Sequence, residues 1–534
     1  MRRSGLEPAM VRPQEVSVSV PTVHPFRGLD LAALLELRAR ERGSHPFLVW
    51  SPFEGPSETW TYARFADQVS RLAGGLAARG VGKGDRVMVV LENCPETLLC
   101  LFACARLGAI HVPVNAMLTG PELRWYAGFL RPAGAITQPK LSAELLSHCP
   151  DLAWIAVTAT DAGMPAEATG VPERSSSFVS LFGEPIAARA PDPTQPALIM
   201  FTSGTTSHPK AVLWTHANGL WGARLGALHQ ALRADDVCHI FLPLFHVVGL
   251  SWCFLPALWS GATVVLQPRF SASRYWPAAL DNGATVGSQV LFTARVLSQQ
   301  PVPEGHKFRQ WLNAQCLAEY ESHFGVRIVG AWGMTEVVSQ GIVGDPWQCQ
   351  PGGSIGRPSP AYRVRIVDEE GRLVAPGQTG SLLIGGVRGL SIFSEYFDDP
   401  DATREAFDDA DYFRTGDRVI LREDGFIEFS EREKDLIKVG GESVAPAEIE
   451  RIIMQLPSVH EAAVVGKSDS DYGEVPVAFV VPKAQEPDLI AKVFDHCRSS
   501  LARFKQPREV IIIEELPRIN FGKISKALLR KRLN

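Results

Sequence analysis

Two hydrophobic periods alternate along the first half of the chain. Residues 57–80 (SETWTYARFADQVSRLAGGLAARG) start as a short strand and continue with apolar residues at helical spacing. Residues 86–91 form an apolar run of strand length, residues 95–108 a buried helix pattern, and residues 109–114 another strand. The same alternation returns over residues 237–267. Strands that alternate with helices in this way predict a layered α/β architecture with largely parallel sheets.

The pattern changes toward the C-terminus. After about residue 355, short strands and turns (YRVRIVDEEGRLV, GSLLIGG, GFIEFS) predict a β-rich subdomain. From Leu436 onward, two helix patterns and two long strand patterns predict a smaller α+β unit. We therefore expect a large domain of layered α/β subdomains and the β-rich subdomain over residues 1–433, and a small domain over residues 434–534.

Composition and charge narrow the class of protein. With 46% hydrophobic and 21% charged residues the chain is typical of globular proteins. Its net charge of −5 does not indicate a nucleic-acid-binding protein. The most apolar stretch, residues 98–114, contains Arg106 and His111 and is too mixed to span a bilayer. Neither a signal peptide nor a peroxisomal address is recognisable at the ends. Nine cysteines without a Cys-x-x-Cys pair indicate free thiols, so we expect a cytoplasmic protein with no integral membrane segment.

One loop carries a pattern suited to polyphosphate. Residues 202–210 read TSGTTSHPK, in which hydroxyls surround a glycine and a lysine follows. A glycine lets backbone N–H groups approach an anion closely, and the lysine adds positive charge. The P-loop pattern is excluded, because Pro209 precedes Lys210 and Ala211 follows it. The loop predicts a nucleotide enzyme of another class.

Four further segments follow the phosphate loop in a fixed order. They are AWGMTE (331–336), TGD (415–417), EREKDLIKVGGESVAPAEIE (431–450) and PRINFGKISK (517–526). Each alone fits an ordinary turn or helix end. Together with the loop they resemble the adenylate-forming superfamily, which contains acyl-CoA synthetases, peptide-synthetase adenylation domains and beetle luciferases. The resemblance runs from about residue 30 to the C-terminus.

The resemblance implies a site for ATP and Mg²⁺. A carboxylate attacks the α-phosphorus of ATP, and catalysis rests mainly on positioning and electrostatic stabilisation. Glu336 resembles the family's Mg²⁺ carboxylate, a hard oxygen ligand for a hard cation. Asp417 and Arg432 resemble the ribose contacts, and Lys523 the lysine that reaches the α-phosphate. The remaining nucleotide-binding residues implied are Thr202, Ser203, Gly204, Thr205, Thr206, Lys210, Trp332, Gly333, Met334 and Thr335.

A second half-reaction is implied, in which the thiol of coenzyme A displaces AMP. The family's small domain is mobile and turns about a hinge, here Lys434, to exchange Lys523 for a glycine-rich loop. The CoA-binding residues implied are Lys438, Gly440 and Gly441. His246 resembles the gate beside the carboxylate, although a core histidine is the alternative. The catalytic residues implied are Lys523, Lys210, His246 and Thr335.

The chain departs from the superfamily at the adenine loop. The expected paired glycines are replaced by Asn313-Ala314-Gln315, and Ser207 stands where glycine is commoner. Both features resemble the carnitine/crotonobetaine-CoA ligase branch. Side chains could fill the adenine slot, so one alternative is an enzyme that only converts a preformed acyl-adenylate to its thioester. A second alternative is an adenylation enzyme that loads a carrier protein, although we expect no carrier domain after Asn534.

The acyl pocket is the least readable part of the sequence. The resemblance places it at His246, Gly287, Ala294, Gly330, Ala331 and Gly341. The small residues among them leave room for a bulky acid, polycyclic or terpenoid, whereas Trp332 could shorten the cavity. We predict an acyl-CoA synthetase that uses ATP, Mg²⁺ and coenzyme A on a small-molecule carboxylic acid, as a monomer or a homodimer.

Overall fold

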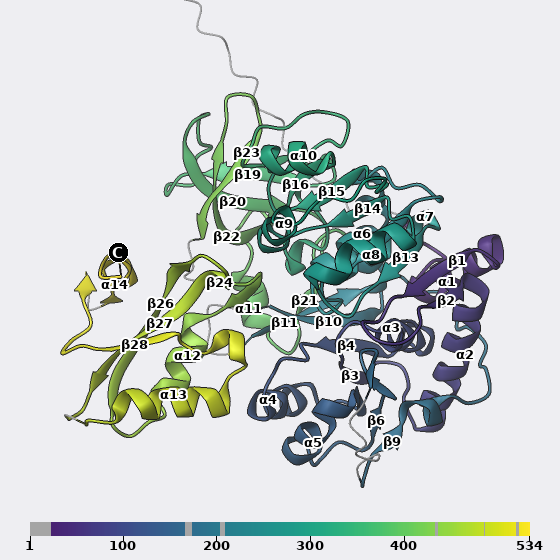
Figure 1. The fold of residues 1–534 in the computed structure, drawn as a ribbon, viewed down its shortest axis with the longest axis horizontal. Coiled ribbons are helices and arrows are strands. Elements are labelled where there is room, and N and C mark those ends of the chain that lie inside the picture. Colours follow the sequence, from purple (N-terminus) through teal and green to yellow (C-terminus); the bar gives the residue numbers. More distant parts are fainter. Residues whose placement is uncertain are drawn as a thin grey trace, which may run out of the picture.

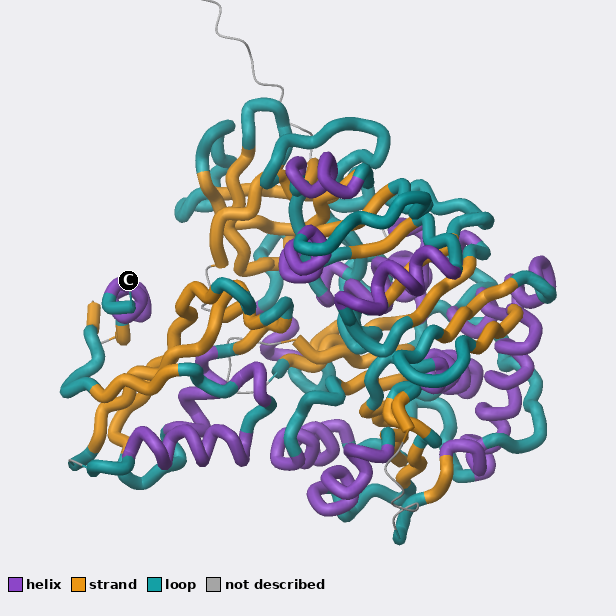
Figure 2. Tube along the Cα trace, in the orientation of Figure 1, coloured by secondary structure: helices purple, strands orange, loops and turns teal. Residues whose placement is uncertain are grey.

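A computed structural model describes residues 23–165, 173–202, 209–432, 436–484, 486–519 and 523–533. Within these residues the chain forms a large N-terminal part, which contains two mixed sheets, and a smaller C-terminal part built on a sheet of its own (Figure 1). Helices and loops cover the sheets of both parts (Figure 2). The predicted α/β class is confirmed. None of the described helices is both long enough and apolar enough to cross a membrane.

The first sheet has eight strands in the order β21-β11-β10-β4-β3-β5-β6-β9. Strands β3 to β6 pair in parallel, β10 runs parallel to β4, and β11 turns back antiparallel to β10. The strands are β3 (Arg86–Val90), β4 (Ile110–Val114), β5 (Gly134–Thr137), β6 (Ile155–Val157), β9 (Ser176–Ser177), β10 (Pro196–Thr202), β11 (Lys210–Thr215) and β21 (Glu395–Tyr396). Since Thr202 pairs with Lys210, the predicted phosphate loop connects β10 to β11.

Helices connect and cover this sheet, as the alternating pattern predicts. Helix α3 is buried on nearly every side because it packs against α1 and α2 as well as against β4. Gly108 ends it in the left-handed region, at φ 74°. The helices of this region are α1 (Leu31–Arg42), α2 (Tyr62–Ala78), α3 (Pro95–Leu107), α4 (Gly120–Leu130), α5 (Pro139–His148) and the 3₁₀ turn η1 (Phe178–Leu181), and a separate hairpin joins β7 (Thr160–Asp161) to β8 (Met164–Pro165).

The second sheet has thirteen strands in the order β19-β20-β22-β23-β18-β17-β16-β15-β14-β12-β13-β1-β2. Its parallel section contains β1 (Pro46–Trp50), β12 (Val237–Ile240), β13 (Thr263–Leu266), β14 (Val286–Ser288), β15 (Gln310–Asn313) and β16 (Arg327–Trp332), with β2 (Glu58–Thr61) antiparallel at the edge. The helices along it are α6 (His216–His229), the π-helix η2 (Val248–Phe254), α7 (Leu255–Ser260), α8 (Ala272–Asp281), α9 (Leu291–Ser298) and α10 (Ala318–Phe324).

The other end of this sheet is the predicted β-rich subdomain. Its antiparallel strands are β17 (Ile342–Val343), β18 (Ser354–Pro358), β19 (Arg363–Val367), β20 (Thr379–Gly385), β22 (Tyr412–Leu421) and β23 (Ile427–Arg432). The 3₁₀ turn η3 (Thr335–Val337) lies between β16 and β17, and α11 (Pro400–Glu405) precedes β22. A common apolar core joins residues of both sheets, so the N-terminal part packs as one body.

The C-terminal part has a sheet in the order β25-β24-β27-β26, with β28 added to β27. Helices α12 and α13 pack on one apolar face of it, and Leu529 of α14 joins the apolar cluster of the other face. The elements are β24 (Ile437–Val439), β25 (Glu442–Val444), α12 (Pro446–Ile453), β26 (Val459–Asp469), β27 (Gly473–Pro482), α13 (Leu489–Ser500), η4 (Arg503–Lys505), β28 (Glu509–Ile512), β29 (Arg518–Ile519), β30 (Lys523–Ile524) and α14 (Lys526–Lys531). The predicted boundary at residues 433/434 falls outside the described residues.

Candidate active site

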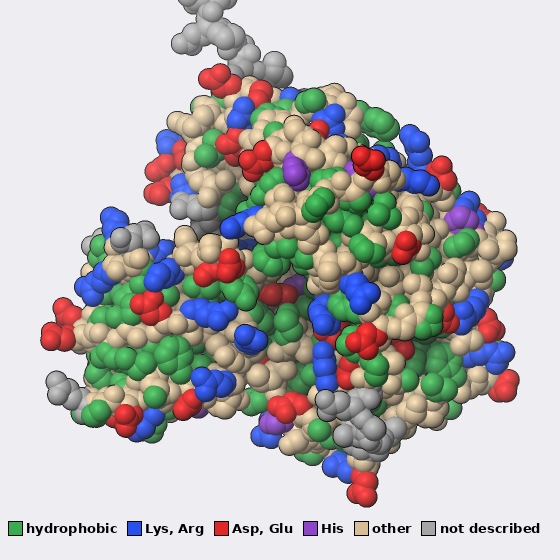
Figure 3. All heavy atoms as spheres, viewed as in Figure 1, with side chains coloured by type: hydrophobic (Ala, Val, Ile, Leu, Met, Phe, Trp, Pro, Cys, Tyr) green, Lys and Arg blue, Asp and Glu red, His purple; other side chains and the backbone are tan. Residues whose placement is uncertain are grey.

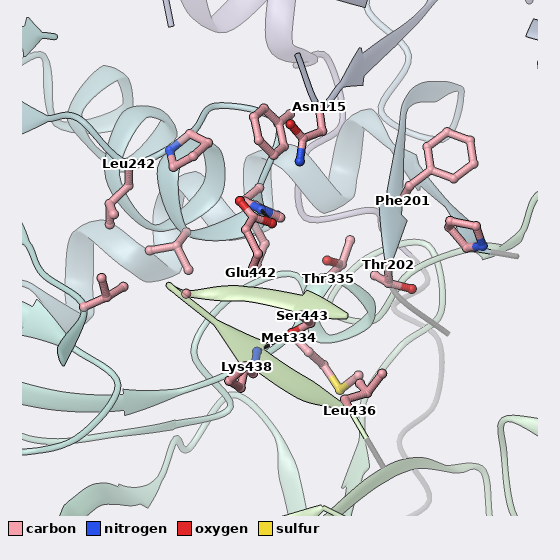
Figure 4. Close-up of a pocket in the computed structure, with 18 of the residues that line it drawn as sticks. Asn115, Phe201, Thr202, Leu242, Met334, Thr335, Leu436, Lys438, Glu442 and Ser443 are labelled. Carbon is pink, nitrogen blue, oxygen red and sulfur yellow. Dashed lines mark hydrogen bonds and ion pairs between the residues drawn. The ribbon is translucent and has the colours of Figure 1, made fainter. Parts of the chain in front are cut away.

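A cavity of about 480 Å³ lies where the C-terminal part meets the N-terminal part. Figure 3 shows a hollow there, in which apolar and acidic side chains are visible. In Figure 4, Glu442 projects from the β24–β25 hairpin, and Thr335 and Thr202 lie on the same side of that hairpin. The residues predicted from the sequence that line this cavity are Thr202, Lys210, His246, Gly333, Met334, Thr335, Glu336, Asp417, Lys438, Gly440 and Gly441.

Glu336 is a buried carboxylate of the cavity, only 3% exposed. The hydroxyl of Tyr396 donates a hydrogen bond to its Oε1 at 2.9 Å, and that of Thr202 donates to the same atom at 3.4 Å. Burial and the neighbouring Glu336 charge raise the pKa of Tyr396, which keeps the phenol protonated as a donor. The ammonium of Lys210 lies 4.4 Å from the centre of the Tyr396 ring. None of the sequence motifs includes Tyr396, which lies sixty positions after Glu336 in the chain.

The oxygens around Glu336 fit Mg²⁺. The described residues contain no cluster of three or more His, Cys, Asp or Glu side chains that could hold a metal. One carboxylate with neighbouring hydroxyls is a hard-oxygen site that depends on phosphate and water for its other ligands, as magnesium sites usually do.

The turn that carries Thr335 and Glu336 is stabilised by a buried tryptophan and continues into a strained backbone turn. The indole Nε1 of the fully buried Trp214 donates to the carbonyl of Thr335 at 2.9 Å. Val338 then adopts φ 68° and ψ −50°, and the Ser339 N–H donates to the Val337 carbonyl at 2.7 Å. This is a γ-turn of the strained kind, which is costly for a β-branched residue. Such strain persists where surrounding structure enforces it, often beside functional groups.

The predicted ribose carboxylate, Asp417, is 1% exposed on β22. The indole Nε1 of Trp332 donates to Oδ2 of Asp417 at 2.9 Å. The backbone N–H of Asp417 donates to the hydroxyl of Thr415 at 3.1 Å. Asp417 is paired with Arg432 across the β22–β23 ladder, although the side chain of Arg432 is outside the described structure. Trp332 therefore orients the Asp417 carboxylate and is not among the described residues that line the cavity.

His246 is paired with a residue of the C-terminal part. Its Nε2 lies 2.8 Å from Oε2 of Glu442, the residue that follows the two glycines. Burial acts to raise the pKa of Glu442, but the charge and hydrogen bond of His246 offset it, so the pKa is lowered. Gly440 and Gly441 have φ values of 60° and 96°, which a side chain would strain. The glycines thus allow the turn that carries Glu442 to His246.

Several predicted residues fall outside the description. Ser203, Gly204, Thr205, Thr206 and Lys434 lie outside the described residues, and so does Ser207. The backbone of Lys523 lies in β30, the short strand before α14 at the outer edge of the C-terminal part (Figure 1). The roles predicted for these residues stay predictions.

The predicted acyl-pocket residues other than His246 do not line the cavity. They are Gly287, Ala294, Gly330, Ala331 and Gly341. Ala294 and Ala331 are buried, and a Cβ on Gly330 would lie 2.3 Å from the carbonyl oxygen of Ser354. The small size of Gly330 thus serves close backbone packing rather than open space, which corrects the expectation of room there. The apolar wall of the cavity instead comes from Phe241, Phe245, Val248, Phe270, Val290 and Phe292.

The segment Asn313-Ala314-Gln315, which replaces the paired glycines expected in the adenine loop, begins at the end of β15. Asn313 is 3% exposed beside Gly330 of β16, and no described residue bonds its Oδ1. The N–H of Cys316 donates to the Ser354 carbonyl at 2.7 Å, which ties the short connection to β18. The connection is therefore folded onto the sheet, and Ala314 remains exposed.

Known proteins resemble the chain over nearly its whole length. Residues 35–397 match the family of AMP-binding enzymes, and residues 448–523 match the AMP-binding enzyme C-terminal domain. A crotonobetaine/carnitine–CoA ligase of Salmonella typhimurium (strain LT2) is 33% identical, covering 94% of this chain and 99% of the relative.

Two solved structures of one enzyme, o-succinylbenzoate CoA synthetase (MenE) of Bacillus subtilis, are each 27% identical to this chain. A double mutant bound with the product analogue OSB-NCoA has a TM-score of 0.81 and covers 93% of this chain and 98% of its own. The complex with AMP has a TM-score of 0.65 and covers 94% and 97%.

These relatives are ligases of acids and CoA, which favours acyl-CoA synthesis over the two alternatives, thioester formation alone and carrier-protein loading. ATP or AMP and coenzyme A are the cofactors of such enzymes, and Mg²⁺ is typical of them. The chain therefore belongs to the AMP-binding enzyme family, as an AMP-forming acid–thiol ligase.

Proposed function

We propose that this one cavity carries out both half-reactions of an AMP-forming acyl-CoA synthetase. The observation that supports the proposal is that two groups of predicted residues, one from each part of the molecule, line the same cavity. The phosphate- and ribose-type residues Thr202, Glu336 and Asp417 come from the N-terminal part. Lys438 and the glycine pair come from the C-terminal part and line the same cavity.

In the first half-reaction a substrate carboxylate oxygen attacks the α-phosphorus of ATP, and the bond to pyrophosphate breaks. Lys210 and the hydroxyl of Thr202 stabilise negative charge on the phosphates. Glu336 would hold magnesium, which neutralises phosphate charge when bound. Asp417 accepts hydrogen bonds from the ribose hydroxyls. Lys523 would approach the α-phosphate after the C-terminal part, residues 434–534, turns about Lys434.

In the second half-reaction the CoA sulfur attacks the acyl carbon, and the bond to AMP breaks. The β24–β25 hairpin lines the cavity with Gly440 and Gly441, and Glu442 pairs with His246. The chain resembles the relative with a CoA product analogue more than the same relative with AMP, at TM-scores of 0.81 and 0.65. We assign the structure to the arrangement for thioester formation.

The acyl group is proposed to be uncharged and apolar. The cavity wall near His246 is formed by phenylalanines and valines. Glu442 is paired with His246, and Glu448 lies 2.8 Å from the ammonium of Lys505. Neither carboxylate therefore remains to neutralise a quaternary ammonium. We also propose that the protein is located in the cytoplasm. This is supported by its nine cysteines, which form no disulfide.

Pyrophosphate exchange across a panel of carboxylic acids tests the proposal. It is run beside thioester formation from synthetic acyl-adenylates, with CoA and with a phosphopantetheinyl carrier protein as acceptors. Exchange with an apolar acid, and thioester formation with CoA, are expected. Thioester formation without exchange for any acid would refute the adenylation half, and transfer to the carrier alone would refute CoA as the acceptor.

A further inference from the structure

A buried cluster of three charges joins the two parts of the molecule beside the cavity. Glu122 belongs to α4 of the N-terminal part, whereas Lys505 of η4 and Glu448 of α12 belong to the C-terminal part. The ammonium of Lys505 lies 2.6 Å from Glu122 Oε1 and 2.8 Å from Glu448 Oε1. All three side chains are less than 10% exposed. Charges so thoroughly removed from water are costly to separate from their partners.

Glu122 makes a second set of contacts through its other oxygen. As the third residue of α4 it closes a capping box, in which Oε2 accepts from the N–H of Thr119 at 2.8 Å. The same oxygen accepts from the N–H of Ala502 at 3.1 Å, which lies in the C-terminal part. The Thr119 hydroxyl also lies 3.2 Å from the carbonyl oxygen of Ser500, the last residue of α13. The start of α4 is thus bonded to the end of α13 and to η4.

These contacts exist only while the two parts keep the arrangement seen here. If the C-terminal part turned away, Lys505 and Glu448 would leave together, because both belong to it. Glu122 would stay on α4 and lose its charged partner and the Ala502 bond. The arrangement that keeps these bonds is also the one that brings Gly440, Gly441 and Glu442 to the cavity.

We propose that Glu122 is a positioning residue for thioester formation, which holds the C-terminal part in place by receiving Lys505 and the backbone of Ala502. The inference rests on the proposed function, since it assumes that the two half-reactions use different arrangements. Glu122 acts through the placement of the glycine turn and has no role in the chemistry itself.

The test is Glu122→Gln in the full-length enzyme. Glutamine at this helix position still closes a capping box, so α4 is retained, but the charge facing Lys505 is removed. A matched control is Glu144→Gln, because Glu144 accepts from the N–H of Gly120 at 2.9 Å and supports the same helix start, while among the described residues it forms no hydrogen bond or ion pair with the C-terminal part. Single-turnover thioester formation from a synthetic acyl-adenylate and CoA is measured beside pyrophosphate exchange.

The proposal expects Glu122→Gln to slow thioester formation at least tenfold while pyrophosphate exchange stays within twofold of wild type. The control should change neither rate by more than twofold. Equal loss of both rates in Glu122→Gln would mean a general structural role and would overturn the proposal, as would two unchanged rates. If this variant does not fold, Lys505→Gln removes the opposite charge, and the same split between the two rates is required of it.

Failure of the proposed function is distinguishable from failure of this inference. A wild-type enzyme that performs neither half-reaction would refute the function itself. A wild-type enzyme that performs both, with rates that Glu122→Gln leaves alone, would refute only the role of Glu122.

Discussion

Removing the hydroxyl of Tyr396 tests the metal role of Glu336. Tyr396→Phe keeps the aromatic ring, whose centroid lies 4.8 Å from that of Phe393 and which contacts the ammonium of Lys210. Packing is therefore preserved. What is lost is one hydrogen bond to a buried carboxylate. A hydrogen bond to a charged group stabilises a protein by roughly 1.5–3 kcal/mol.

The expected change in melting temperature follows from the size of the N-terminal part. An unfolding entropy of about 2.1 cal/mol/K per residue, over roughly 400 residues, means that 1 kcal/mol shifts Tm by about 1 °C. Tyr396→Phe should therefore lower Tm by about 2–4 °C in EDTA, measured by calorimetry. With Mg²⁺ and ATP the deficit should shrink by at least half, because a bound cation compensates the buried carboxylate in place of the phenol.

Tyr362→Phe is the matched control. The Tyr362 hydroxyl donates to the carbonyl of Val337 at 2.7 Å, on the same turn, and accepts from the indole Nε1 of Trp221 at 3.2 Å, so both of its partners are neutral. Losing these two hydrogen bonds should lower Tm by about 1–4 °C, equally with and without Mg²⁺ and ATP. A Tyr396→Phe deficit that Mg²⁺ and ATP leave unchanged would refute the assignment of Glu336 as the metal ligand.

Two further predictions concern buried carboxylates. Trp332→Phe removes the hydrogen bond from the indole to Asp417. We expect KM for ATP to rise about tenfold and discrimination between ATP and 2′-deoxy-ATP to fall. Unchanged discrimination would contradict the role of Asp417 in binding the ribose. Asp236 accepts from Arg309 at 2.7 Å, and although burial opposes it, this partner lowers the pKa of Asp236. Because the folded-state pKa is lowered, the interaction contributes stability that is present above the unfolded pKa of about 3.9 and is lost as the pH falls through the folded one. Asp236→Asn should therefore lower Tm clearly at pH 7 and progressively less as the pH falls below about 4; a loss that does not change with pH would be inconsistent with this linkage.

The sequence alone determined the class of fold and the order of the motifs. Helix and strand periods are local properties, so the α/β alternation up to residue 267 and the change to short strands after residue 355 are readable without the structure. The turn glycines are readable for the same reason, because a left-handed φ at Gly440 and Gly441 is a property of the backbone itself. Motif resemblance then named Glu336 and Asp417, which the structure brings to one cavity.

Only the tertiary structure decided which side chains support those residues and where open space lies. Tyr396 reaches Glu336 because β21 pairs with β11 at the edge of the sheet, and Lys505 meets Glu122 across 383 positions. Gly330 was expected to leave room for substrate, but neighbouring backbone fills that space. A small residue permits a cavity and close packing equally, and packing between distant segments chooses one of them. That choice is made by contacts that no local pattern contains.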